Sequence, residues 1–304
     1  MIPFNFRRIR AGLAVLAAIG CALASAAQAA DERIEFPGAP GRDRLIGQLS
    51  RPVGEGPWPA VVMMHGCSGL GSARGPMPLY RDWRDLLTGQ GYVVLMVDSA
   101  ASRGFGQTCT PGAERLRMWA ERPADAYAAL AYLQGQSFVL PDQVALAGWS
   151  QGGGVALLAV AARSSGRPTP APAHDFAAAV AFYPGACSDR LQSRPFVADT
   201  PPNSWTTSVP LLVLQGGADN WTPAAPCIEL ILAAARRGSP AAIQIYPGAA
   251  HAFDAANVPV HAIERYRQND WAPIIGTHAE ARRDARERVV QFLAEVLGGR
   301  STRR

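Results

Sequence analysis

The sequence contains no lysine: its 29 positions counted as lysine or arginine are all arginine. A hydrolase that pairs serine with lysine is therefore excluded, because arginine keeps its proton in proteins and cannot act as the base. Beyond the first ten residues, no stretch combines clustered arginine with interleaved aromatic side chains. Nucleic acid is therefore not an expected partner.

The chain begins with an apolar run that is too short for a membrane span. Basic MIPFNFRRIR precedes apolar AGLAVLAAIGCALASA and then AQAADE, whereas a spanning helix needs roughly 20 apolar residues. A basic head, an apolar middle and a small-residue exit are typical of a secretory signal peptide. We expect cleavage after Ala29, so that residues 30–304 are exported to the periplasm or secreted, without stable membrane insertion.

Two other export signals are alternatives. Cys21 would be the acylated residue of a lipoprotein, but Ala18 stands where such signals carry a large aliphatic residue. Arg7 and Arg8 are a weak match to a twin-arginine signal. Removal of the leader takes away three arginines and no acid, which lowers the formal net charge from +5 to +2. The basic balance therefore belongs largely to the leader.

Cysteine is also scarce, with five residues in the chain and no Cys-x-x-Cys pair. A zinc site is therefore not expected. Four cysteines remain after removal of the leader, namely Cys67, Cys109, Cys187 and Cys227. An even number of cysteines in an exported protein favours disulfides, and four cysteines allow three connectivities.

Strand-like and helix-like segments alternate along the chain. Continuous apolar runs indicate strands buried on both faces, at 44–52, 60–66, 92–99, 144–150, 178–185, 210–217 and 242–248. Helical segments are expected at 79–91, 123–136, 155–164, 223–238 and 278–299. This alternation predicts an α/β fold with a mostly parallel sheet of about eight strands flanked by helices. No linker or internal repeat divides the chain, so we expect one domain over residues 30–304.

A serine between glycines lies where one of these strands meets a helix. The sequence GWSQGGG, residues 148–154, joins apolar VALA to apolar VALLAVAA. The pattern alone is weak evidence in a chain with 30 glycines, and an incidental serine in a turn is the alternative. A nucleophile elbow requires small neighbours, because its backbone is strained and the helix passes close to the strand. Gly148 and Gly152 supply them, so we expect Ser150 to be a nucleophile.

The partners of such a serine follow in the order that the chemistry requires. Asp219 follows the apolar run 210–217, and His251 follows the run 242–248. The histidine would take the serine proton, and the carboxylate would hold the histidine in the right tautomer. Asp189 and Asp254 are the alternative acids. The order of serine, acid and histidine is that of α/β-hydrolases.

The charge of a tetrahedral intermediate also needs preorganised donors. One would be the backbone N–H of Gln151, the residue after the nucleophile. The other would be the backbone N–H of Cys67, in the loop that follows the strand 60–66. His65 and Gly66 would shape that loop and take no part in proton transfer.

With HGCSG, GWSQGG, GGADNWTP and AAHAFD in this order, the chain resembles the dienelactone hydrolase family of α/β-hydrolases over roughly residues 40–298. The resemblance implies an ester or lactone hydrolase without a cofactor, in which Ser150, Asp219 and His251 are catalytic. The founding members use cysteine where this chain has Ser150, which argues against dienelactone itself as the substrate.

Three residues are candidates for substrate binding. The resemblance places Arg103 where the family can hold a substrate carboxylate, and an arginine that braces the loop is the alternative. Trp149 and Trp221 flank the expected site and would wall an apolar pocket, unless they belong to the core.

The positions of the cysteines favour one pairing. If the strands 178–185 and 210–217 are neighbours, Cys187 can reach Cys227. Cys67 and Cys109 both follow strand ends on the expected active-site edge, where a disulfide would pin the oxyanion loop.

The sequence therefore predicts an exported serine hydrolase that cleaves small-molecule esters or lactones through an acyl-enzyme. One alternative is a peptidase of the prolyl-oligopeptidase type, although the chain lacks a propeller-length extension and an obvious amine-binding acidic pair. A catalytically silent binding protein with this fold is the other. The polar stretch 255–275 has no predicted role.

Overall fold

The computed structural model describes residues 31–197 and 199–298. The expected leader, with Arg7, Arg8 and Cys21, lies outside the described residues. Within the described part, no helix is both long and apolar enough to cross a membrane.

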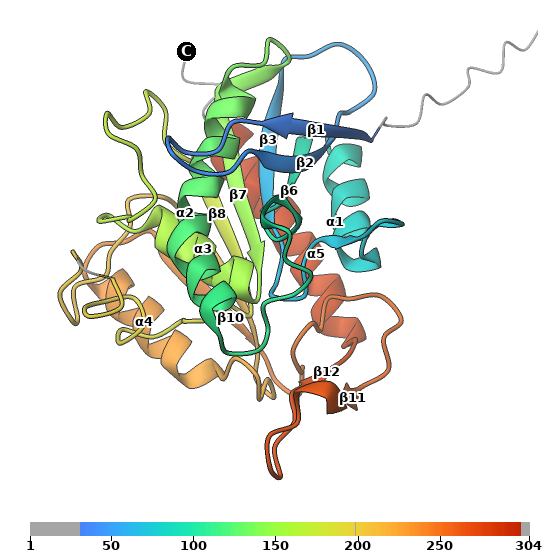
Figure 1. The fold of residues 1–304 in the computed structure, drawn as a ribbon, viewed down its shortest axis with the longest axis vertical. Coiled ribbons are helices and arrows are strands. Elements are labelled where there is room, and N and C mark those ends of the chain that lie inside the picture. The colour runs from blue at the N-terminus through green and yellow to red at the C-terminus, as the bar shows by residue number, and fades with distance from the viewer. Residues whose placement is uncertain (1–30, 198, 299–304) are drawn as a thin grey trace, which may run out of the picture.

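One eight-stranded sheet runs through the molecule (Figure 1), in the order β1-β2-β6-β3-β7-β8-β9-β10. β2 pairs antiparallel with β1 and β6, and all the other pairs are parallel. The fold class predicted from the sequence is thus confirmed. The strands are β1 Glu32–Phe36, β2 Leu45–Ser50, β3 Trp58–Met64, β6 Val93–Asp98, β7 Val139–Trp149, β8 Ala178–Phe182, β9 Leu211–Gly216 and β10 Ala241–Tyr246. Two small pairs lie outside this sheet, β4 Gly71–Ser72 with β5 Gly75–Pro76 and β11 His261–Ala262 with β12 Ile274–Ile275.

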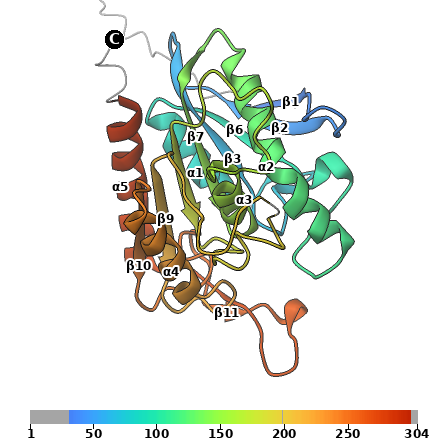
Figure 2. The same ribbon diagram turned by 90° about the vertical axis from the view of Figure 1, so that its left-hand side faces the viewer.

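Helices cover both faces of the sheet. On one face lie α2 (Ala113–Gln134), α3 (Gln151–Val160) and α4 (Ala224–Arg236), and on the other lie α1 (Pro78–Gly89) and α5 (Ala279–Leu293). Figure 2 shows α2 and α5 on opposite sides of the strands. Alternate side chains of each strand point to opposite faces, so Val62 belongs to the first core and Met63 to the second. Burial on both faces explains why the strands are continuous apolar runs.

The helix α2 begins at Ala113, well before the expected start at Pro123. Proline is favoured in the first turn of a helix, because it lacks the N–H that later positions need. Here the helix continues through Pro123. The additional turns carry Arg115, Trp119 and Arg122, which all lie close to the candidate site.

Candidate active site

Ser150 forms the turn between β7 and α3. Its backbone lies at φ 53° and ψ −115°, in a region that residues other than glycine rarely adopt. A Cβ at Gly148 would lie 2.1 Å from the carbonyl oxygen of Gly152, and one at Gly152 would lie 2.1 Å from that of Met64. Only glycine fits such a close approach of helix and strand. This geometry is that of a nucleophile elbow.

The strain at Ser150 predicts a difference in stability between two variants at this position. Ser150→Gly removes the Cβ and with it a conformational cost of about 1–3 kcal/mol, while glycine itself loses about 0.5–1 kcal/mol through greater freedom of the unfolded chain. Ser150→Ala keeps the strain. We therefore expect Ser150→Gly to unfold at higher urea concentration than Ser150→Ala, by about 1 kcal/mol in unfolding free energy. Equal midpoints would show that the turn is relaxed.

His251 and Asp219 form a buried pair, with 2.7 Å between His251 Nδ1 and Asp219 Oδ2. Asp219 Oδ1 also accepts hydrogen bonds from the backbone N–H groups of Trp221 (2.8 Å) and Thr222 (2.9 Å). Burial raises the pKa of Asp219, but the nearby His251 ring and the hydrogen bonds from His251 and Thr222 outweigh burial and lower the pKa below its usual value. Asp219 is therefore ionised at neutral pH and holds Nδ1 of the ring, which leaves Nε2 for a partner on the other side.

The two alternative acids have other partners. Asp189 lies in the loop after β8, where its carboxylate accepts the backbone N–H of Asn203 at 2.5 Å. Asp254 is fully buried, and its partners are aromatic side chains. Among the described carboxylates, Asp219 is the one bonded to His251.

Asp254 is the acceptor of a buried aromatic cluster. Its Oδ2 accepts the indole N–H groups of Trp83 and Trp149, both at 2.8 Å, and its Oδ1 accepts the Tyr183 hydroxyl at 2.7 Å. Burial raises the pKa of Asp254, while these three bonds act in the opposite direction. The Tyr183 ring lies 4.4 Å from the His251 ring, between centroids. Asp254 thus supports the surface on which His251 rests.

Trp149 corrects an expectation from the sequence. Its side chain is 1% exposed, belongs to the core and does not line the pocket beside Ser150. The reason is strand alternation: Trp149 precedes the elbow on β7 and points toward α1, where its ring stacks on Phe182.

Arg103 also differs from its expected role. Its guanidinium donates two hydrogen bonds of 2.9 Å to Asp125, one of 2.7 Å to Glu121 and one of 2.9 Å to the Ser99 carbonyl. Its side chain is buried and does not line the pocket. The expectation of a substrate carboxylate at Arg103 is therefore wrong, because two acids of α2 already occupy this arginine. It braces the loop after β6.

The loop after β3 lies close to Ser150. Cys67 and Gln151 line the same cavity as Ser150. As the first residue of α3, Gln151 has a backbone N–H without a partner inside the helix. The preceding Gly66 N–H is already bonded to the Tyr80 hydroxyl at 2.8 Å, which fixes the loop just before Cys67.

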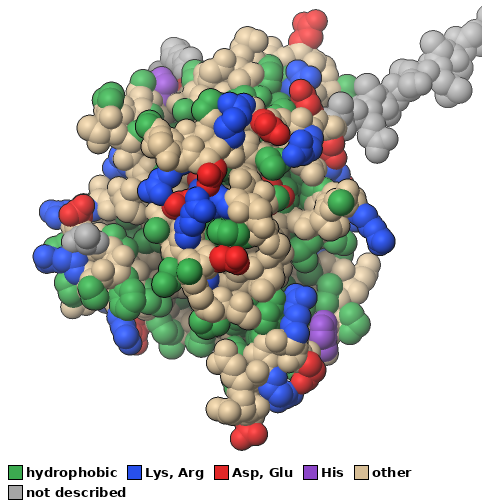
Figure 3. All heavy atoms as spheres, viewed as in Figure 1, with side chains coloured by type: hydrophobic (Ala, Val, Ile, Leu, Met, Phe, Trp, Pro, Cys, Tyr) green, Lys and Arg blue, Asp and Glu red, His purple; other side chains and the backbone are tan. Residues whose placement is uncertain are grey.

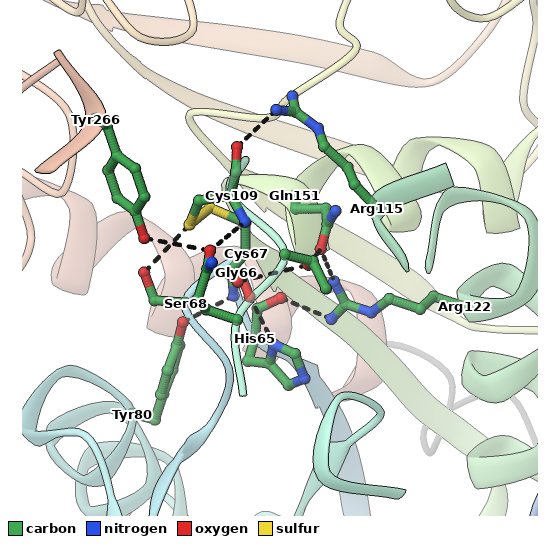
Figure 4. The surroundings of a disulfide bond; sticks show 12 residues. His65, Gly66, Cys67, Ser68, Tyr80, Cys109, Arg115, Arg122, Gln151 and Tyr266 are labelled. Carbon is green, nitrogen blue, oxygen red and sulfur yellow. Dashed lines mark hydrogen bonds between the residues drawn. A yellow bond between two sulfur atoms is a disulfide. The ribbon is translucent and has the colours of Figure 1, made fainter. Parts of the chain in front are cut away.

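Arg122 is a residue that sequence reasoning missed. It is fully buried, and donates to the Gln151 side-chain oxygen at 3.0 Å and to the His65 carbonyl at 2.6 Å (Figure 4). Burial lowers its pKa to about 10, so it remains a cation at neutral pH. One charged side chain therefore connects both segments expected to supply oxyanion donors. The helix predicted from the sequence began at Pro123 and so did not include Arg122, the residue directly before it.

Two disulfides lie at the rim of the cavity. They join Cys67 to Cys109 and Cys187 to Cys227, the connectivity suggested by the strand positions. Cys67, Cys109 and Cys187 line the cavity.

The cavity beside Ser150 has a volume of about 260 Å³. Trp221 lines it, with its ring 4.9 Å from the His251 ring and 5.5 Å from the ring of Tyr266. The stretch 255–275 thus supports a wall of the site through Tyr266. Thr222 lines the cavity too, and its hydroxyl lies 3.1 Å from His251 Nδ1. In the described part of the chain, no cluster of histidine, cysteine or acidic side chains could hold a metal ion.

A mostly parallel sheet with a strained serine turn after a central strand places the protein among the α/β-hydrolases. Within that class, the profile of the dienelactone hydrolase family matches residues 45–297, and the chain belongs to this family. No curated protein sequence matches the chain.

Solved structures share the fold at low sequence identity. A putative dienelactone hydrolase from Klebsiella pneumoniae subsp. pneumoniae MGH 78578 is 19% identical, with a TM-score of 0.62 over 88% of this chain and 99% of that chain. A thermophilic esterase from Thermogutta terrifontis, bound to propionate, is 19% identical, with a TM-score of 0.58 over 88% and 94%. A puromycin-hydrolyzing peptidase from Mycobacterium tuberculosis is 20% identical, with a TM-score of 0.62 over 89% of this chain and 40% of that chain.

Proposed function

We propose that the protein is an exported serine hydrolase that cleaves small-molecule carboxylic esters or lactones through an acyl-enzyme, without a cofactor. The observation that carries the proposal is the strained turn at Ser150, which opens into a cavity whose wall residue Thr222 contacts the His251–Asp219 pair. Family membership and the esterase fold support it.

Each of these groups has a defined role in the proposed reaction. Ser150 Oγ attacks the ester carbonyl while His251 Nε2 takes its proton, and Asp219 stabilises the imidazolium that forms. The backbone N–H groups of Cys67 and Gln151 would bind the oxyanion. The intermediate collapses, the alcohol leaves with the proton from His251, and an acyl–Ser150 ester remains. Water, deprotonated by His251, then attacks the acyl carbon; the bond to Ser150 Oγ breaks, Oγ takes the proton from His251, and the carboxylic acid is released.

Export is supported by the two disulfides, because such bonds persist in oxidising compartments. The leader predicted at residues 1–29 agrees with this.

Replacement of Ser150 by alanine tests the nucleophile. We expect Ser150→Ala to lose all labelling by a fluorophosphonate probe and to hydrolyse p-nitrophenyl esters at least about ten-thousandfold more slowly, because the group proposed to form the acyl-enzyme is gone. Ser188→Ala is the matched control, since Ser188 lines the same cavity away from the elbow. Labelling that persists in Ser150→Ala would refute the assignment.

The alternatives are separated by substrate. A peptidase would prefer aminoacyl anilides to p-nitrophenyl esters. This alternative is tested because one of the structural neighbours is a peptidase. A silent binding protein would hydrolyse neither and would not be labelled. We expect ester hydrolysis to be the faster reaction.

A further inference from the structure

A second, larger cavity continues from the one beside Ser150. It has a volume of about 630 Å³, within the range of about 300–1,000 Å³ that is usual for ligand sites. Four residues line both cavities, namely Arg115, Trp119, Ala186 and Leu191. We call this cavity the acyl groove. Its wall is completed by Pro111, Gly112, Leu116, Ala120, Leu158, Ser165, Phe196 and Val197. The two cavities are therefore parts of one continuous site.

The acyl groove is apolar and open to solvent. Among the described residues that line it, only Arg115 and Ser165 have polar side chains. Three large apolar side chains of its wall are exposed: Leu116 by 71%, Phe196 by 57% and Leu191 by 37%. Hydrophobic side chains gather on this side of the molecule in the space-filling view (Figure 3). Contiguous exposed apolar surface of this kind marks a binding site.

Arg115 is the one cationic side chain among the described residues of the groove, and it lies where the two cavities meet. Its guanidinium donates to the Cys109 carbonyl at 2.7 Å, which ties it to the loop beside the first disulfide. Burial lowers its pKa, which reflects the apolar surroundings at the junction of the two cavities.

The chemistry of the serine decides which half of an ester occupies the groove. The leaving alcohol must receive its proton from His251, so it lies toward the residues that contact His251, which are Trp221 and Thr222. Neither of these residues lines the acyl groove. The groove therefore leaves the catalytic cavity on the side away from His251, where the acyl part of the substrate extends.

We propose that the acyl groove binds the hydrocarbon part of the acyl group, and that the substrates are esters of apolar, medium-chain carboxylic acids. This inference rests on the proposed serine hydrolase function. The cavity of about 260 Å³ beside Ser150 lies below the usual size of a ligand site, so it holds the reacting carbonyl and a small alcohol. The acyl groove holds the rest of the acyl chain.

The test compares p-nitrophenyl octanoate with p-nitrophenyl acetate in the purified mature protein. Each buried methylene can add up to about fourfold in kcat/KM, so we expect octanoate to exceed acetate by at least about tenfold. In Ala120→Trp, which places an indole in the groove from an exposed position of α2, we expect this ratio to fall by at least about tenfold. Leu116→Glu should lower it in the same direction.

Leu232→Glu is the matched control, because Leu232 is also an exposed leucine on a helix (47%) and lies outside both cavities. It should keep the wild-type ratio. A ratio that is the same in wild type, Ala120→Trp and Leu116→Glu would overturn the acyl groove. So would a chain-length preference that follows the alcohol, seen with octyl acetate against ethyl acetate.

Fluorophosphonate labelling separates the two proposals. Labelling at Ser150 without any effect of acyl length would overturn the groove and leave the hydrolase in place. Absence of both labelling and hydrolysis would overturn both.

Discussion

Asp219→Asn is expected to lower kcat for ester hydrolysis by about ten-thousandfold while the protein remains folded. The asparagine keeps the size of the side chain, and its oxygen can still accept the backbone N–H groups of Trp221 and Thr222. Its amide N–H₂, however, would face His251 Nδ1, where Asp219 now lies at 2.7 Å. That contact favours the tautomer with the proton on Nε2, and Nε2 can then no longer take the proton of Ser150.

Steady-state kinetics with a p-nitrophenyl ester, together with a thermal melt, measure this effect. Asp189→Asn is the matched control, because Asp189 bonds a loop N–H outside the pair and should retain nearly full activity. A similar loss in both variants would mean that Asp219 has no special part in the chemistry. A large loss confined to Asp189→Asn would instead identify Asp189 as the acid.

Asp254→Ala is expected to produce the largest loss of stability among single substitutions near the site. It leaves the indole N–H groups of Trp83 and Trp149 and the Tyr183 hydroxyl without an acceptor inside the protein. Each unpaired buried donor costs about 1–3 kcal/mol, against a total stability of roughly 5–15 kcal/mol for a typical protein. The variant should therefore lose at least about 3 kcal/mol in unfolding free energy.

Urea denaturation followed by tryptophan fluorescence measures this loss. Asp270→Ala is the control, because Asp270 is an exposed aspartate in a loop, and its removal should leave the midpoint nearly unchanged. If Asp254→Ala is as stable as Asp270→Ala, the carboxylate is not the acceptor that holds this cluster. Residual activity adds a second measure, since Tyr183 supports the ring of His251.

The parts of the site that were predicted from the sequence are those with local signals. The continuous apolar runs predicted a sheet buried on both faces. The glycines around Ser150 predicted the tight turn that lies between β7 and α3. The order of Asp219 and His251 after successive strands placed them at one edge of the sheet. Each of these signals consists of a strand segment and the residue that directly follows it, so each is local along the chain.

The parts that were missed depend on contacts between distant segments. Arg122 and Gln151 are 29 positions apart, and Trp83 and Asp254 are 171 apart, so no local pattern joins them. The sequence left Arg103 with two roles, a substrate contact or a brace of its loop. One of the acids that hold it, Glu121, belongs to the first turns of α2, ahead of Pro123, which were not predicted. The low helix propensity of Pro123 was outweighed by the burial of its neighbours in α2.

The order of the strands along the chain has a consequence for when the protein can become active during synthesis. Cys67 follows β3, Ser150 follows β7, Asp219 follows β9 and His251 follows β10. Synthesis runs from the N-terminus, so the segment with the serine is made before the segment with the histidine. A truncated translation product that ends before β10 would carry Ser150 without His251, so the proposed mechanism predicts no hydrolytic activity for it.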